Sequence, residues 1–151
     1  MATTTAAITL TSADLLTDAL SLSATNTLYK AGTTVGLDQT TGTTKAYLTA
    51  TTEVDIFPPL IEGSLAFAGK SSWVYICNKS EDETEFATIK ISGNIIGKLY
   101  AGDYLWMPWN MSEDADTDNK HADIQLTPSV ATGMWFEWVC INEGTEYPTS
   151  V

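Results

Sequence analysis

Apolar and polar residues alternate along most of this chain in short runs, and a period of two residues predicts β-strands. The predicted strands are 43–57 in two pieces, 73–77, 86–92, 95–100, 104–109, 121–126 and 134–141. Turn signals separate these runs, among them Pro58-Pro59 and Gly93-Asn94. Many short strands at regular spacing indicate a β-sandwich or barrel, and we expect an all-β fold, an antiparallel, jelly-roll-like β-sandwich.

The most apolar runs each contain one of the chain's two cysteines. Residues 73–77 (WVYIC) are apolar on both faces, which is typical of a central strand. In residues 134–141 one face collects Met134, Phe136, Trp138 and Cys140. Both positions favour buried thiols over a disulfide framework. Pairing of Cys77 with Cys140 stays open, because it depends on which strands are neighbours.

The first 52 residues hold 17 of the 24 threonines and neither Trp nor Phe. We therefore divide the chain into a Thr-rich N-terminal arm with lead-in strands, 1–52, and a sandwich core, 53–151, which together make one compact unit. Residues 1–10 are expected to form an extended arm or short strand. Residues 12–20 predict one short helix capped by Thr11 or Ser12, whereas the alternation of Leu20 and Leu22 with serines favours a strand over 19–25.

Leu99 to Trp109 (LYAGDYLWMPW) predicts a hairpin, with two apolar strands joined by a tight turn at Ala101-Gly102-Asp103. Its aromatic side is expected to close the sandwich or to meet a neighbouring subunit. Trp106 is expected in the core or at a subunit interface, and Trp109, at the edge of a polar loop, is expected to be exposed. A second interpretation of the chain's aromatic residues is a platform for sugar rings, as in carbohydrate-binding β-sandwiches.

Charge limits the classes of partner that we expect. The chain has 19 Asp and Glu but only seven Lys and no Arg, which gives a net charge of -12. Such a surface repels phosphate, so we expect no nucleic-acid partner and no binding to an anionic membrane. The N-terminus lacks the basic and apolar regions of a signal peptide, and no window is long and apolar enough to span a bilayer. We therefore expect synthesis in the cytoplasm.

The sequence offers no catalytic or cofactor motif, so we expect neither an enzyme nor a bound cofactor. His121 is the chain's single histidine and stands at a predicted strand start, where a solvated role is expected. Asp114, Asp116 and Asp118 alternate as in a calcium loop. An EF-hand would need Gly and Glu where Asn119 and Gln125 stand, so an acidic solvated loop is favoured.

The order of motifs from Trp73 to Asn142 resembles small virion structural proteins of tailed bacteriophages. The motifs are WVYICN, FATIKIS, KLYAGDYLWMPW, HADIQL, SVATG and a final WFEWVCI. In that pattern a Leu-x-x-Gly-Asp/Glu turn leads into an aromatic-Pro segment, and the last strand closes a small β-sandwich. The Thr-rich lead-in, LSATNTLYKAGTTVGLDQTTGT, also looks like phage structural sequences, whose arms reach over neighbouring subunits.

Among such proteins the resemblance implies a capsid decoration or cement protein, which stabilises the head by binding across capsomers of the major capsid protein. It implies a homotrimer on the capsid exterior, and the negative charge agrees because the packaged genome would repel it. The expected interface residues are Trp106, Trp109, Tyr104, Leu10 and Ile8. The alternatives are a tail, neck or fibre component and a carbohydrate-binding β-sandwich module.

Overall fold

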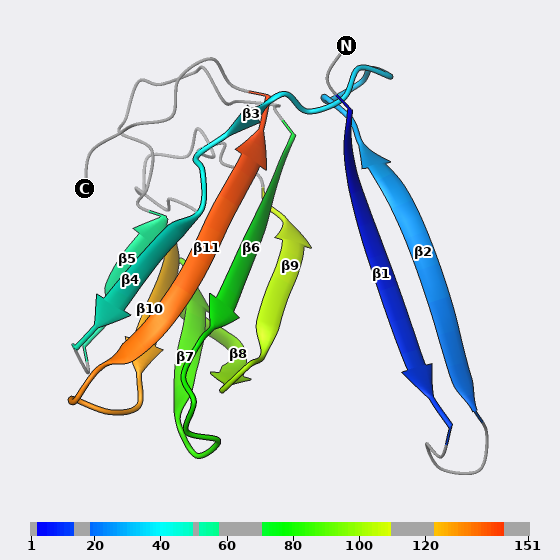
Figure 1. Cartoon of the computed structure of the whole chain (residues 1–151). Coiled ribbons are helices and arrows are strands. Elements are labelled where there is room, and N and C mark those ends of the chain that lie inside the picture. The colour runs from blue at the N-terminus through cyan, green and yellow to red at the C-terminus, as the bar shows by residue number, and fades with distance from the viewer. Residues whose placement is uncertain (1–2, 14–18, 50–51, 58–70, 110–122, 144–151) are drawn as a thin grey trace, which may run out of the picture.

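The computed structural model describes residues 3–13, 19–49, 52–57, 71–109 and 123–143, and every regular element in these ranges is a β-strand. Eleven strands form three sheets (Figure 1), and all of their pairings are antiparallel. Each sheet has two free edges in the described ranges, so none closes into a barrel. The prediction of an all-β, antiparallel fold is confirmed.

The first sheet is a two-stranded hairpin of β1 (Thr4–Ser12) and β2 (Leu20–Leu28), which stands to one side of the other two sheets in Figure 1. Ser12 is the register partner of Leu20, and Thr4 is the partner of Leu28. A helix over 12–20 is therefore wrong at both ends, and its central residues 14–18 lie outside the described residues. The alternation of leucines with serines correctly indicated a strand, because Thr and Ser on one face suit an exposed sheet.

The second sheet has four strands in the order β5-β10-β7-β8. Their bounds are Val54–Phe57 for β5, Ile124–Pro128 for β10, Phe86–Ile91 for β7 and Asn94–Tyr100 for β8. The β7–β8 turn is formed by Ser92 and Gly93, whose φ angles of 49° and 75° match the twist of a tight hairpin. This places the predicted Gly93-Asn94 turn one residue earlier.

The third sheet has five strands. Their bounds are Gln39–Thr40 for β3, Thr44–Leu48 for β4, Met134–Asn142 for β11, Ser72–Asn78 for β6 and Tyr104–Pro108 for β9. Strand β6 lies between β11 and β9, as the central strand predicted from its two apolar faces. Strands β3 and β4 pair with opposite ends of β11. Part of the Thr-rich region thus belongs to this sheet.

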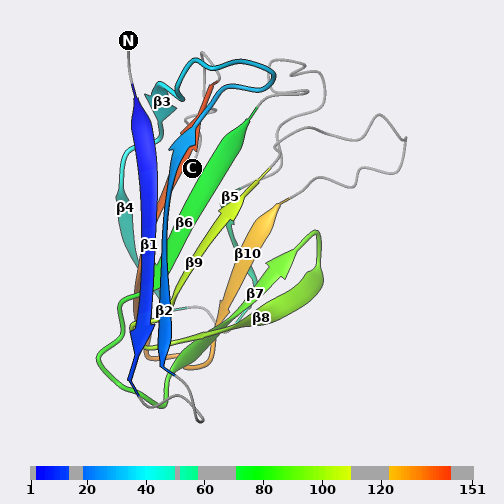
Figure 2. The ribbon, with the colours of Figure 1, turned by 90° about the vertical axis from the view of Figure 1, so that its right-hand side faces the viewer.

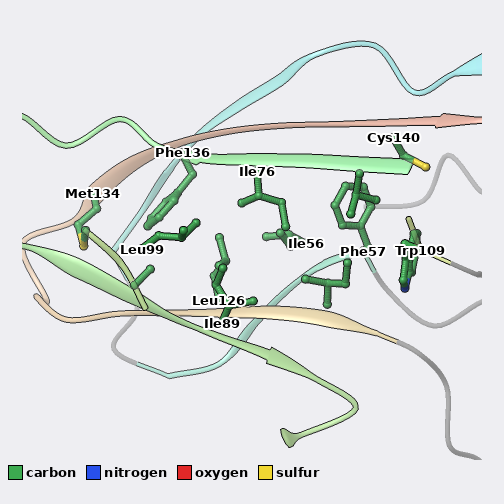
Figure 3. Packing of buried hydrophobic residues seen from close by; sticks show 13 residues of the cluster. Ile56, Phe57, Ile76, Ile89, Leu99, Trp109, Leu126, Met134, Phe136 and Cys140 are labelled. Atoms are coloured by element: carbon green, nitrogen blue, oxygen red, sulfur yellow. The ribbon is translucent and has the colours of Figure 1, made fainter. Parts of the chain in front are cut away.

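The hydrophobic core lies between the four-stranded and five-stranded sheets, which Figure 2 shows as separate layers. Figure 3 shows side chains of both sheets meeting there, and its largest fully buried members include Phe57, Phe136, Ile76, Ile124 and Leu126. The predicted inward face of β11 is confirmed: its members lie in this core or pack against it. Burial of these apolar side chains is the main contribution to the stability of the two sheets.

The predicted hairpin over Leu99–Trp109 is wrong, because β8 and β9 belong to different sheets. The turn between them bonds instead to the end of β6: the Gly102 amide donates to the Asn78 carbonyl at 2.9 Å, and the Asn78 amide donates to the Asp103 carbonyl at 3.0 Å. Gly102 has a φ of 80°, which glycine adopts without strain. The turn therefore carries the chain from one sheet to the other.

The expected exposure of Trp109 is wrong. Trp109 is only 5% exposed, and its ring lies 5.1 Å from that of Phe57 in the core. Trp106 is half-buried on the opposite face of β9, stacked on Trp73 at 5.2 Å. The physical reason is the period of two, which continues through Pro108 and puts Trp109 on the inward side with Leu105.

Candidate interaction surface

The outer face of the five-stranded sheet, turned away from the core, is rich in aromatic side chains. Alternation along β4, β6, β9 and β11 places these residues opposite the buried ones. We call this surface the outer aromatic face and define it by Tyr47, Trp73, Tyr75, Tyr104, Trp106, Trp135, Val139 and Ile141. Trp135 and Tyr104 are 52% and 57% exposed.

Neighbouring rings stiffen the outer aromatic face. Tyr75 and Tyr104 lie 6.0 Å apart between ring centroids, and Tyr47 and Trp135 lie 5.2 Å apart. The Tyr47 hydroxyl also donates to the Thr132 carbonyl at 2.7 Å. A Cβ at Gly133 would lie 2.5 Å from the Tyr47 ring, so the absence of a side chain there lets this ring come close to the turn.

The outer face of the four-stranded sheet is different, because it carries charges. Lys90 pairs with Glu53 at 2.8 Å, and the Gln125 amide donates to Asp55 at 3.0 Å. Burial raises the pKa of the Asp123 carboxyl, and the negative charges of Asp55 and Glu53 raise it further. In contrast, the ionic contact on the outer aromatic face, within the residues described, is that of Lys45 with Glu137 at 3.3 Å.

The β1–β2 hairpin also has two unlike faces. Its register places the aliphatic side chains on one face, which we call the hairpin apolar face and define by Ala6, Ile8, Leu10, Leu20, Leu22 and Ala24. The other face is almost entirely Thr and Ser. Ile8 is 39% exposed and Leu10 is 47% exposed. An isolated two-stranded sheet is marginally stable in water, so an apolar face of this kind favours a partner.

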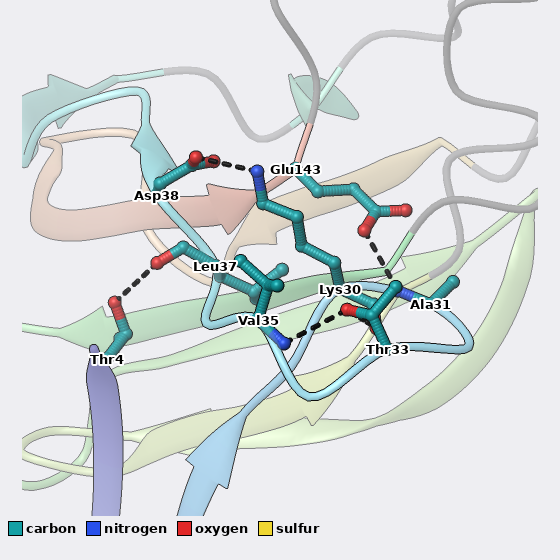
Figure 4. Close-up of polar contacts among 8 residues, drawn as sticks. All are labelled: Thr4, Lys30, Ala31, Thr33, Val35, Leu37, Asp38 and Glu143. Carbon is teal, nitrogen blue, oxygen red and sulfur yellow. Dashed lines mark hydrogen bonds and ion pairs between the residues drawn. The ribbon is translucent and has the colours of Figure 1, made fainter. Parts of the chain in front are cut away.

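The base of the hairpin is fixed by a compact loop (Figure 4). The Thr4 hydroxyl donates to the Leu37 carbonyl at 2.9 Å, and Leu37 itself is fully buried. Lys30 pairs with Asp38 at 2.6 Å. The Glu143 carboxylate accepts from the Ala31 amide at 2.8 Å, which ties the loop to the residue after β11. The hairpin therefore leaves the sheets from a well-anchored base.

The structure divides the five predicted interface residues among three places. Ile8 and Leu10 lie on the hairpin apolar face, Tyr104 and Trp106 lie on the outer aromatic face, and Trp109 lies in the core. Sequence reasoning placed Trp135 among the aromatic residues of the possible sugar platform but not among the interface residues, because strand order decides which alternating residues share a face. The calcium candidates Asp114, Asp116 and Asp118, and also His121, lie outside the described residues.

In the part of the chain that the structure describes, no group of three or more His, Cys, Asp or Glu side chains could hold a metal ion. Within the same ranges, no helix has the length and apolar character needed to cross a membrane. Comparison of the chain with protein-family models, with curated proteins and with solved structures gave no match. The candidate functional site therefore consists of the outer aromatic face and the hairpin apolar face.

Both cysteines are free and buried, as predicted. They lie on neighbouring strands but on opposite faces of the sheet. Register partners share a face, and Cys77 is the partner of Glu137 on the outer face, whereas Cys140 is the partner of the buried Val74. Cys140 belongs to the core, and burial raises the pKa of its thiol to about 12. A disulfide between two faces of one sheet is geometrically excluded, so the cysteines serve packing.

We expect Cys140 to resist iodoacetamide in the folded protein at mildly alkaline pH and to react fully in denaturant, as measured by mass spectrometry. The pKa of the Cys140 thiol lies near 9.0 in the unfolded chain, and burial raises this pKa to about 12 in the folded protein. The folded state then binds more protons, so the free energy of unfolding falls as pH rises between these values. A Cys140→Ala variant should lose this part of the pH dependence; equal slopes would contradict the assignment.

Proposed function

We propose that this chain is a virion structural protein of a tailed bacteriophage that decorates the capsid exterior. It would act as a cement protein, bound across capsomers of the major capsid protein, after synthesis in the host cytoplasm. The finer fold that we propose is an antiparallel, jelly-roll-like β-sandwich formed by the four-stranded and five-stranded sheets. The observation that supports the proposal is that one acidic chain presents two apolar surfaces, the hairpin apolar face and the outer aromatic face.

Cement proteins work by binding the assembled shell and not its separated parts, so each bound copy stabilises the shell by mass action. Such binding needs apolar surfaces that stay exposed on the free protein and become covered on the shell. The hairpin apolar face and the outer aromatic face meet this requirement, with Leu22 46% exposed and Trp135 52% exposed. The net charge of -12 supports a position facing solvent and away from the packaged genome.

The test is removal of the gene from the phage that carries it, followed by cryo-microscopy and heating of the particles. We expect wild-type heads to show this chain at regular positions on the outside of the shell. Heads without it should release their genome at a lower temperature, and purified protein added back should restore the wild-type temperature. Density for the chain in the tail, neck or fibres alone would reject decoration and support the tail, neck or fibre alternative.

A carbohydrate-binding module is the second candidate, favoured by one observation. Trp135 and Tyr47 form an exposed ring pair on the outer aromatic face, and exposed rings stack on the apolar faces of sugars. A glycan array distinguishes the candidates: binding that Trp135→Ala abolishes would support the module. No binding by the wild-type chain would reject it.

A further inference from the structure

We propose that copies of this chain assemble head to tail, with the hairpin apolar face of one subunit lying on the outer aromatic face of the next. This proposal names the self-contact within the proposed function, whose setting is the virion. The contact itself joins two copies of the chain and can be tested without a capsid. The occupant of each apolar face is therefore a second copy of the same chain.

The hairpin apolar face needs a cover that the described residues of its own chain do not supply. Ile8, Leu10 and Leu22 are each exposed by more than a third of their surface. Figures 1 and 2 show the two strands running the length of the molecule beside the sheets, joined to them at the base. Two strands without a covered face are marginal in water, so covering this face stabilises the hairpin as well as the contact.

Charge indicates which face of a second copy the hairpin apolar face can cover. The described residues of the hairpin, 3–13 and 19–28, contain no charged side chain, although the chain has a net charge of -12. The outer aromatic face carries Lys45 and Glu137 as a neutral pair. These two surfaces can therefore meet without like-charge repulsion. The four-stranded sheet offers Glu53, Asp55 and Asp123, where burial under a neighbour would desolvate several carboxylates.

Shape also fits. Nine-residue strands give the hairpin a length of about 30 Å and, with two strands and their side chains, a width of about 10 Å. Three adjacent strands, β11, β6 and β9, offer a surface of similar width, and sheets pack face to face in aligned or orthogonal arrangements. Aliphatic side chains on the hairpin then lie against the flat rings of the neighbour.

Area favours a closed ring over an isolated pair. One contact of this footprint buries roughly 600 Å² in total, which is small for a stable interface. In a ring each subunit uses its hairpin once and part of its outer aromatic face once, so every copy makes two such contacts and keeps the rest of that face for the capsid. A symmetric contact between two hairpins would leave the outer aromatic face exposed. We therefore expect a closed ring, and the trimer that the phage resemblance implies is one such ring.

The first experiment measures the mass of the full-length chain by analytical ultracentrifugation. We expect wild type to sediment as a closed oligomer and Leu10→Lys to lose it, because burial of the introduced ammonium in the contact would remove its hydration and replace an aliphatic side chain. The matched control is Thr9→Lys, which places the same residue on the hydroxyl face one position away and should keep the oligomer. Unchanged thermal unfolding of the core in both variants shows that folding is intact.

The second experiment identifies which surfaces touch. A tagged Leu22→Cys chain and an untagged Tyr104→Cys chain are mixed and treated with a short bismaleimide, with wild type as the control for the two buried native thiols. We expect a mixed tagged–untagged product, which only a contact between subunits can give. Products of Leu22→Cys with itself alone would overturn the head-to-tail contact in favour of paired hairpins.

A monomeric wild-type chain at every soluble concentration, or equal effects of Leu10→Lys and Thr9→Lys, would also overturn the proposal. These outcomes are separate from those of the proposed function. A chain that forms the head-to-tail oligomer but lies in the tail would keep the contact and reject capsid decoration. A chain that decorates heads as single copies would do the reverse.

Discussion

Trp109→Ala is expected to lower the free energy of unfolding by about 3 to 5 kcal/mol, which would leave many domains of this size barely folded. The ring is 5% exposed and packs against Phe57, so its removal opens a cavity between the sheets at the end of β9. The hydrogen bond that the Trp109 amide donates to the Ser72 carbonyl, at 2.9 Å, joins backbone atoms and would remain. The loss is therefore one of packing, measured by urea denaturation followed by circular dichroism.

Trp135→Ala is the matched control. It removes the same kind of side chain from the outer face of the five-stranded sheet, whereas Trp109 lies on the core side. At 52% exposure this ring buries less apolar surface, and the expected loss in the monomer is about 1 kcal/mol or less. The order of the two variants is the decisive result. Equal losses, or a larger loss for Trp135→Ala, would show that Trp109 does not fill the core as described.

Asn78→Ala is expected to cost about 2 to 4 kcal/mol, because it removes a buried polar link between the two large sheets. Asn78 is fully buried at the end of β6, and its side-chain amide donates to the Leu99 carbonyl of β8 at 3.1 Å. Its side-chain oxygen accepts from the Ser80 amide at 2.9 Å. Alanine leaves both backbone groups without these partners, and an unpaired buried group carries its full desolvation penalty.

Asn94→Ala is the control for this prediction. The Asn94 side chain donates to the Ser92 carbonyl at 3.1 Å in an exposed turn, where water replaces the lost bond, so a change within about 0.5 kcal/mol is expected. Chemical denaturation measures both variants on the same scale. A cost for Asn78→Ala no larger than that of Asn94→Ala would mean that this link between the sheets contributes little.

Periodicity predicted strands well where the burial of one face is complete. In β11 the alternating Met134, Phe136 and Cys140 are all buried, and in β6 the flanking strands cover both edges. An alternating pattern shows which face of a strand is apolar, and this face is buried where a second sheet covers it. The strands of both large sheets could for this reason be located from the sequence alone.

Strand partners could not be predicted, because they depend on contacts between distant residues. The turn at Ala101-Gly102-Asp103 has the chemistry of a hairpin, yet its amide and carbonyl groups bond to Asn78, more than 20 residues away. The helix predicted over 12–20 failed for a related reason: Ser12 is a good helix cap in isolation, but its pairing with Leu20 makes it part of a strand.

The candidate site followed the same division. Ile8, Leu10, Tyr104 and Trp106 were predicted as interface residues, and all four lie on the two apolar surfaces; their place at an interface stays a prediction. The gathering of Trp135 and Tyr47 with them arises from the order β4-β11-β6-β9 across the sheet, which no local pattern encodes. Trp109 was misplaced because a neighbouring polar loop was given more weight than the period of two.

The way β3 and β4 share one strand has a mechanical consequence. Force applied to the hairpin would enter the sheets through residues 29–38 and then reach β3, which pairs with Ile141 and Asn142. Thr41 follows, bonded to both the amide and the carbonyl of Cys140 at 3.0 Å, and only then β4. These contacts would yield one after another along β11, so the anchor of the hairpin releases load in steps while the core between the sheets stays closed.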